Sequence, residues 1–173
     1  MPTTICIQLS AAGAWQAGEP EAASDGVLLL RVLALMEAAP PHLDDEDGPD
    51  ALRWQALEAR VDLTLQLLGQ LLARGVPRPP VCNFLLSGET ASWTMPAAPS
   101  LGEVGTLALY LSSRIPQPLQ LPATVTAVEP MADGARVTVT FNRLEPELQD
   151  WLDKTIFRRH RREIFERKHS HDE

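Results

Sequence analysis

Residues 50–74 read DALRWQALEARVDLTLQLLGQLLAR, contain no proline, and carry an apolar side chain at about every third or fourth position. This period predicts one continuous helix, ~36 Å long at 1.5 Å per residue. Its apolar faces must be covered, either by the rest of the same domain or by other copies of the chain. One set of positions alternates spacings of three and four, as in a coiled-coil seam: Trp54, Leu57, Val61, Thr64, Leu68 and Leu71.

A second apolar stripe, formed by Val61, Leu65, Leu68 and Leu72, runs beside the first. Together the stripes are wider than one helix pair requires, so the helix is expected to contact more than one neighbour. Thr64 is a polar residue at a d-like position, which lowers stability but helps to fix register and helix number. The broad second stripe favours an assembly of more than two such helices.

The composition indicates a folded protein, because 173 residues with 45% hydrophobic content can bury one substantial core. The formal net charge of -8 is unevenly spread. Residues 19–62 hold eleven acids and three bases, whereas residues 154–168 hold seven bases and two acids. The acidic balance disfavours non-specific nucleic-acid binding by the whole surface, although the basic segment could contact nucleic acid locally.

Cys6 and Cys82 lie far apart and lack metal-ligand spacing, so neither a metal site nor a disulfide framework is expected. The N-terminus has no basic start followed by an apolar run, and no stretch approaches the roughly 20 apolar residues of a membrane span. We therefore expect a soluble, cytoplasmic protein. Glycine-rich phosphate loops, GxSxG and HExxH are all missing from the sequence, so an enzyme is not expected.

The chain before the long helix predicts one strand and one helix. Residues 3–9 alternate and are β-branched, as in a short strand, whereas residues 11–20 resemble a loose connection of small residues. Ser24 or Asp25 can cap a helix over residues 27–38. Residues 42–50 form an acidic linker, and Gly75 and Pro77 are expected to end the long helix.

After Pro80 the period changes to about two, with frequent turn residues. This pattern predicts strands at residues 81–86, 90–94, 104–111, 119–128 and 136–141. Asp133 and Gly134 predict a hairpin in which both occupy the central turn positions. Six strands, counting residues 3–9, favour a closed barrel or a small sandwich, and Pro146 opens a last helix with a basic end.

The closing phrase VTVTFNRLEPELQDWLDKTIFRRHRREI resembles the last strand and C-terminal helix of the PilZ domain, and the resemblance covers residues 81 to about 162. It implies an α+β fold, a six-stranded antiparallel PilZ-like β-barrel with two inserted helices and a C-terminal helix. Residues 1–168 would form a single domain, residues 25–74 a two-helix insertion for oligomerisation, and residues 169–173 a flexible tail.

PilZ domains usually bind cyclic di-GMP through RxxxR and [DN]xSxxG motifs. This chain contains Arg74 and Arg78, then Asn83, Ser87 and Gly88. The family places a strand between the two motifs, whereas here they are nearly adjacent, and the second reads NxxxSG. The resemblance therefore implies a degenerate site that does not hold the nucleotide. The alternative is a functional receptor that uses Arg74 and Arg78, or the C-terminal arginines.

The chain also resembles a PilZ subgroup that forms tetramers through inserted heptad helices. The resemblance implies a non-enzymatic module without a cofactor, acting through protein partners in cyclic di-GMP related regulation of pili, motility or virulence. Its oligomerisation residues would be Trp54, Leu57, Val61, Thr64, Leu65, Leu68, Leu71 and Leu72. The candidate partner-binding residues are Arg158, Arg159, Arg161 and Arg162.

Overall fold

The computed structural model describes residues 4–19, 25–38, 48–74 and 77–169, without the side chains at 72, 73 and 169. Most of the acidic linker predicted at 42–50, the helix end predicted at Gly75 and almost all of the tail predicted at 169–173 lie outside these ranges. The side chain of Leu72, a predicted oligomerisation residue, also lies outside the described part.

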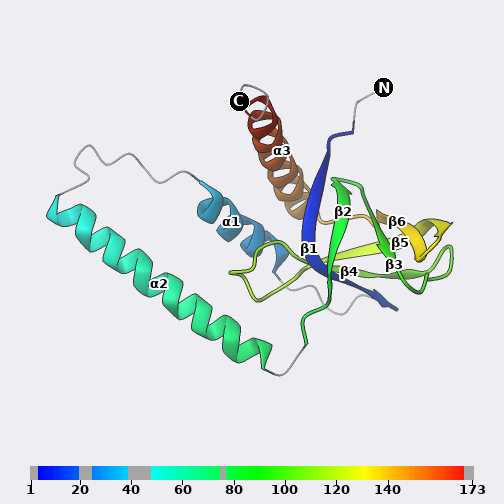
Figure 1. The fold of residues 1–173 in the computed structure, drawn as a ribbon, viewed down its shortest axis with the longest axis horizontal. Coiled ribbons are helices and arrows are strands. Elements are labelled where there is room, and N and C mark those ends of the chain that lie inside the picture. The colour runs from blue at the N-terminus through cyan, green and yellow to red at the C-terminus, as the bar shows by residue number, and fades with distance from the viewer. Residues whose placement is uncertain (1–3, 20–24, 39–47, 75–76, 170–173) are drawn as a thin grey trace.

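Six strands form a closed antiparallel barrel with the order β1-β2-β3-β6-β5-β4 (Figure 1). The predicted α+β fold with a six-stranded barrel is therefore confirmed. Each strand lies within about three residues of its predicted position, except the first. The strands are β1 (Cys6–Ala17), β2 (Val81–Ser87), β3 (Thr90–Met95), β4 (Val104–Tyr110), β5 (Leu119–Met131) and β6 (Gly134–Phe141).

Strand β1 extends to Ala17, so the prediction of a loose connection from residue 11 was wrong. Its first half pairs with β2 and its second half with β4, and this double pairing closes the barrel. A Cβ atom on Gly13 would lie 2.5 Å from the Phe84 ring. The small residues that suggested a loop are therefore positions where other parts of the barrel come close.

Asp133 and Gly134 lie in the β5–β6 hairpin, as predicted, but not both at its centre. Met131 pairs with Gly134, which leaves Ala132 and Asp133 as the two connecting residues. Gly134 has a φ of +132°, and every described residue with a positive φ is a glycine, so Asp133 does not have one. The hairpin is confirmed, but the prediction that Gly134 occupies a central turn position was wrong.

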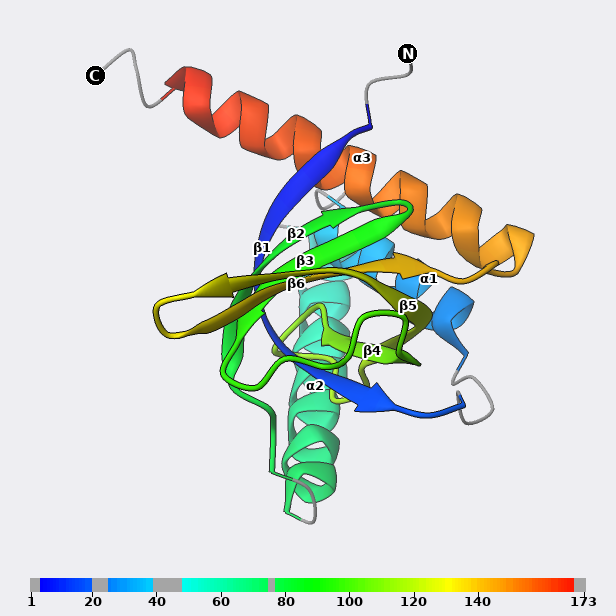
Figure 2. The same ribbon diagram turned by 90° about the vertical axis from the view of Figure 1, so that its right-hand side faces the viewer.

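Three helices accompany the barrel: α1 (Gly26–Glu37), α2 (Pro49–Ala73) and α3 (Pro146–His169). As predicted, α1 and α2 lie between β1 and β2 in the chain, and the Asp25 carboxylate accepts a hydrogen bond from the Leu28 N–H at 3.0 Å. Helices α1 and α3 pack on each other and on the barrel (Figure 2).

The core continues from the barrel interior to these two helices. Phe84 and Trp93 lie inside the barrel with ring centroids 5.4 Å apart. Leu30 of α1 and Leu152 of α3 belong to the same buried cluster. Helix α1 is therefore part of the domain's own core.

Helix α2 is arranged differently. Among the described residues it lies beside no other helix or strand, and Figure 1 shows it extending along one side of the molecule. Its contacts are with the loop between β4 and β5, where Arg114 forms an ion pair with Asp62. The two inserted helices thus differ, because among the described elements α1 packs on a strand and on α3, whereas α2 packs on neither a helix nor a strand.

Candidate functional site

Among the described elements, α2 carries the most exposed large apolar side chains. The apolar members of the predicted seam are between 48% and 62% exposed, and Thr64 is exposed among them. The Thr64 hydroxyl donates a hydrogen bond to the Arg60 carbonyl at 2.8 Å, which satisfies it within the helix. The exposed apolar members are Trp54, Leu57, Val61, Leu68 and Leu71.

Three further leucines on α2 are at least half exposed and were missed by the sequence analysis: Leu52, Leu63 and Leu67. Leu63 and Leu67 are four residues apart and therefore share a face of the helix. This spacing could have identified them, but only the positions of the coiled-coil seam were considered, and neither belongs to it. They widen the exposed surface on the side away from Leu65. Leu65 itself is half-buried beside the β4–β5 loop.

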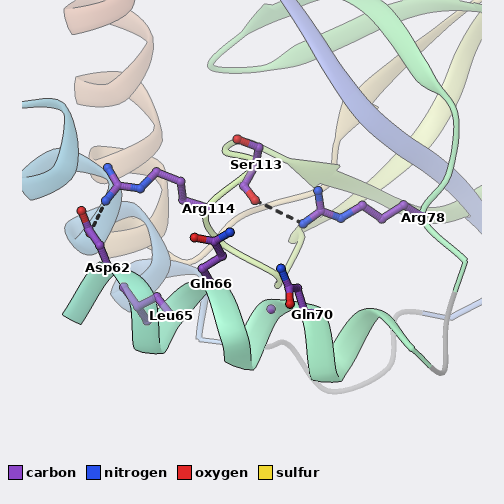
Figure 3. A pocket seen from close by; sticks show the side chains of 8 residues that line it. Asp62, Leu65, Gln66, Gln70, Arg78, Ser113 and Arg114 are labelled. Atoms are coloured by element: carbon purple, nitrogen blue, oxygen red, sulfur yellow. Dashed lines mark hydrogen bonds and ion pairs between the residues drawn. The ribbon is translucent and has the colours of Figure 1, made fainter. Parts of the chain in front are cut away.

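The seam and the loop-facing side lie on different faces of α2. At ~100° per residue, the seam is centred about 150° from the face formed by Asp62, Gln66, Gly69 and Gln70. That second face lines the space beneath the β4–β5 loop (Figure 3). The apolar seam therefore points away from the rest of its own chain.

The candidate nucleotide residues lie in two separate places. Arg74 is the C-cap residue of α2 and is exposed. Arg78 donates to the Ser113 carbonyl at 3.5 Å, and its guanidinium lies 5.4 Å from the centroid of the Tyr110 ring. Arg78 lies three residues before β2, whereas Arg74 lies at the end of α2.

Ser87 and Gly88 lie at the opposite end of β2. The Ser87 hydroxyl accepts hydrogen bonds from the N–H groups of Glu89 and Thr90, which ties the β2–β3 turn. A Cβ atom on Gly88 would lie 2.1 Å from the Asp153 carboxylate of α3. Because β2 is extended, Val81 and Ser87 are separated by ~20 Å, so the structure does not bring Arg78 and Ser87 together.

Asn83 lies between these places, exposed on the outer face of β2 opposite Ser10 of β1. Its side chain is on the alternate face of the strand from the buried Phe84. The five residues of the degenerate motifs are therefore spread from the end of α2 along the length of β2 and do not form a single pocket.

The C-terminal arginines are only partly available to partners. Arg158 and Arg159 hold the Glu37 carboxylate of α1, and their side chains are 29% and 16% exposed. Arg162 donates to the Glu37 carbonyl at 3.1 Å. The fourth, Arg161, is exposed and lies 5.9 Å from the centroid of the Phe157 ring.

Glu37 is the acidic centre of this cluster. Burial by itself raises the pKa of the Glu37 carboxyl, but hydrogen bonds and charge from Arg159 and Arg158 outweigh burial and hold the pKa below its ordinary value. The carboxylate is therefore ionised at neutral pH. A sequence pattern could not pair these groups, because they are more than 120 residues apart.

The described residues contain no group of three or more histidine, cysteine, aspartate or glutamate side chains that could hold a metal ion. No described helix is both long enough and apolar enough to cross a membrane. What the described surface does offer is an exposed apolar helix face, a polar groove beneath it, and one exposed basic segment of α3.

A closed six-stranded barrel accompanied by three helices places the chain in the α+β class of small β-barrel domains. Residues 30–169 match the sequence profile of the atypical PilZ domain, described as a cyclic di-GMP receptor. The match covers most of the chain, and this protein therefore belongs to the atypical PilZ family. A comparison with curated proteins finds no match.

Among solved structures, the chain is similar to a pathogenic protein from Xanthomonas campestris, described as a tetrameric PilZ domain self-assembled via an unusual helical bundle. The identity is 27% over 95% of this chain and 92% of that one, with a TM-score of 0.79. The Bacillus subtilis inhibitor of motility is also similar, at 15% identity over 46% of this chain and 41% of that one. Its TM-score is 0.38.

Proposed function

We propose that this protein is a non-enzymatic, cytoplasmic PilZ module that assembles as a tetramer through α2. In this proposal it acts through protein partners in cyclic di-GMP related regulation of pili, motility or virulence. The observation that carries the proposal is the exposed apolar seam of α2, a 25-residue helix whose seam points away from its own barrel.

Exposed apolar surface on this scale is unusual for a monomer and marks an interaction site. Burying the exposed half of each large seam side chain would contribute ~1 kcal/mol, so one helix would contribute several. The Xanthomonas campestris protein, described as a tetrameric PilZ domain self-assembled via a helical bundle, supports assembly of this chain through a helix.

The assembly is tested by placing two charges in the seam. The double change Val61→Asp and Leu68→Asp is expected to convert tetramers into monomers, because a carboxylate buried in an apolar bundle has no partner. Sedimentation velocity measures the change, and circular dichroism checks that the barrel remains folded. The matched control, Gln55→Asp with Gln66→Asp, adds the same charge away from the seam and should stay tetrameric.

We also propose that the degenerate motif residues do not hold cyclic di-GMP. The separation of Arg78 from Ser87 along β2 supports this, as does the packing of Gly88 against Asp153. The family's description as a cyclic di-GMP receptor favours a second candidate, a receptor that uses Arg74 and Arg78 or the C-terminal arginines.

Titration calorimetry with cyclic di-GMP separates the two candidates. One outcome is that the wild-type chain binds cyclic di-GMP with micromolar or tighter affinity, loses this binding in the Arg74→Ala, Arg78→Ala variant, and keeps its original affinity in an Asp62→Asn variant. That result would contradict the first candidate, a module that does not hold the nucleotide. No measurable binding by the wild-type chain would contradict the second. The cofactor-free state is part of the same proposal and is tested by the same titration.

Of the four arginines proposed for protein partners, Arg161 is supported best. Arg158, Arg159 and Arg162 are bonded to Glu37, whereas no carboxylate pairs with Arg161 in the described part of the chain. The exposed Phe157 ring beneath it adds an apolar contact of the kind found at protein interfaces.

A further inference from the structure

The second half of α3 carries a mixed apolar and basic surface. At ~100° per residue, five exposed positions fall within about 100° of the helix circumference and form what we call the α3 outer face: Phe157, Arg161, Ile164, Phe165 and Lys168. The three apolar side chains among them are between 40% and 63% exposed. Such a surface on a helix of a folded domain marks an interaction site.

The opposite side of α3 is the buried one. Leu152 and Ile156 belong to the core cluster, and together with the buried Thr155 they are centred about 170° from the outer face. Figure 2 shows α3 lying along one side of the barrel. The α3 outer face therefore points away from the barrel.

The outer face is positively charged, and acids of its own helix do not balance that charge. Glu163 and Glu166 are the only acids in residues 157–168. Both lie at least about 140° from the centre of the outer face. Within the described part of the chain, no ion pair joins Arg161 or Lys168 to a carboxylate. Both bases are therefore available to an anionic partner.

Each base stands one helical turn from an apolar side chain. The Arg161 guanidinium lies 5.9 Å from the centroid of the Phe157 ring. Lys168 follows Ile164 at the same spacing of four residues. With this arrangement the charged groups can stay at a polar boundary while the apolar groups enter a layer beneath it.

We propose that the α3 outer face binds the surface of a membrane that contains anionic phospholipids. Basic side chains are attracted to anionic headgroups, and the apolar side chains beside them enter the boundary between headgroups and acyl chains. Helix α3 lies on such a membrane without crossing it, because its opposite side is packed in the core of its own domain.

A membrane fits the outer face better than nucleic acid or an acidic protein does. Nucleic acid would contact the two bases but would leave three exposed apolar side chains against phosphates and water. An acidic protein would need an apolar groove with carboxylates placed to match one convex helix face. A membrane offers an anionic layer and an apolar layer without such matching.

The acidic character of the whole chain does not prevent this contact. The formal net charge is -8, but residues 154–168 carry seven bases and two acids. At physiological ionic strength charges are screened over ~8 Å, so the bases nearest the membrane dominate the interaction. For the same reason, binding should weaken as the salt concentration rises.

The inference goes beyond the function proposed above, because it uses neither the α2 seam nor the degenerate motif residues. Sedimentation velocity measures the tetramer separately, so a failure of membrane binding and a failure of assembly can be told apart. Arg161 is also the arginine best supported for protein contacts, and a protein partner would therefore compete with the membrane for it.

Co-sedimentation of the full chain with lipid vesicles tests the inference. Vesicles of phosphatidylcholine with about 30% phosphatidylglycerol should bind at least about fivefold more protein than vesicles of phosphatidylcholine alone. Arg161→Gln with Lys168→Gln should lower binding to the anionic vesicles about fivefold or more. The matched control, Arg136→Gln with Arg143→Gln, removes two exposed bases from β6 and the loop after it and should leave binding unchanged.

Phe157→Ala with Phe165→Ala leaves all charges in place and tests the apolar part of the surface. Binding should fall several-fold, while circular dichroism stays unchanged because both rings are at least half exposed. Phe157→Trp should bind like the wild type, and anionic vesicles should shift its fluorescence to shorter wavelength more than that of the wild type. An equal shift would show that residue 157 does not enter the membrane, contrary to the inference.

Three further results would overturn the inference: no binding to anionic vesicles up to ~1 mM lipid, equal binding to both kinds of vesicle, or equal losses in the glutamine pair and its control. Poly-glutamate and a short duplex DNA serve as alternative probes. If either binds in a way that depends on Arg161 and Lys168 while vesicles do not bind, the outer face belongs to an acidic protein or to nucleic acid instead.

Discussion

Arg159 binds Glu37 through two hydrogen bonds, from Nε and Nη2 to one carboxylate oxygen, at 2.9 and 2.6 Å. Arg158 binds the other oxygen, also twice, at 3.0 and 2.9 Å. Glu37 is the last residue of α1, and both arginines lie in the middle of α3. This cluster therefore fixes the C-terminal end of α1 to α3. From that end the chain continues toward α2.

Replacing Glu37 with glutamine is expected to lower the free energy of unfolding by about 2 kcal/mol, because two partly buried guanidiniums lose a charged acceptor. Urea unfolding measures the change. Glu147→Gln is the control, since it removes an ion pair with Arg31 in which both side chains are about half exposed. That change should cost less than about 1 kcal/mol, and equal losses in the two variants would contradict the special role of Glu37.

The same carboxyl makes a predictable contribution to the pH dependence of stability. Its pKa in the folded protein is lower than its ordinary value of 4.5, so the folded state favours the ionised form. This contribution is fully present above the ordinary value and is lost as the pH falls through the folded value. The melting temperature of the wild type should fall more steeply below about pH 4.5 than that of Glu37→Gln, and parallel curves would contradict this assignment.

Leu30 and Leu63 distinguish the two inserted helices. Leu30 of α1 is fully buried in the barrel core, whereas Leu63 of α2 is 55% exposed. Leu30→Ala should lower the free energy of unfolding by about 3 kcal/mol, because it leaves a cavity. Leu63→Ala should have an effect of less than about 0.5 kcal/mol when measured in the monomeric Val61→Asp, Leu68→Asp background. A large loss from Leu63→Ala in that background would show that α2 is covered by its own chain.

Thr64→Leu should strengthen the assembly but broaden the distribution of oligomers. An apolar residue at this position removes a polar group from the proposed seam, which should strengthen helix association. It also removes the polar residue that helps to fix helix number and register. Native mass spectrometry should show species besides the tetramer for Thr64→Leu. Thr64→Ser keeps the hydroxyl and should give the wild-type distribution. A single tetrameric species for Thr64→Leu would show that this residue does not select the oligomer.

Much of the fold could be predicted, because the signals for its elements are local. The absence of proline and the apolar period over residues 50–74 predicted α2 to within one residue at each end. Alternation and turn residues located five of the six strands. The start of β1 was also predicted, but its second half, AAGAWQA, has few β-branched residues and forms a strand only because β4 pairs with it.

The candidate site was predictable only where one helix carries it. The seam from Trp54 to Leu71 follows from the period of the sequence, and the structure leaves its members exposed. The groove was not predicted, because it combines α2 with Arg78 and with the loop at Ser113 and Arg114. Nothing in the spacing of these residues indicates that the loop approaches α2.

The sequence by itself therefore determined the elements and the apolar period of α2, because backbone preferences and side-chain periods act over a few neighbouring residues. Only the tertiary structure decided how these elements are used. It buried α1 in the core, paired Arg158 and Arg159 with Glu37, and left the α2 seam uncovered. The reason is that burial and ion pairing depend on which distant segments come into contact when the barrel closes. The local sequence pattern carries no information about those contacts.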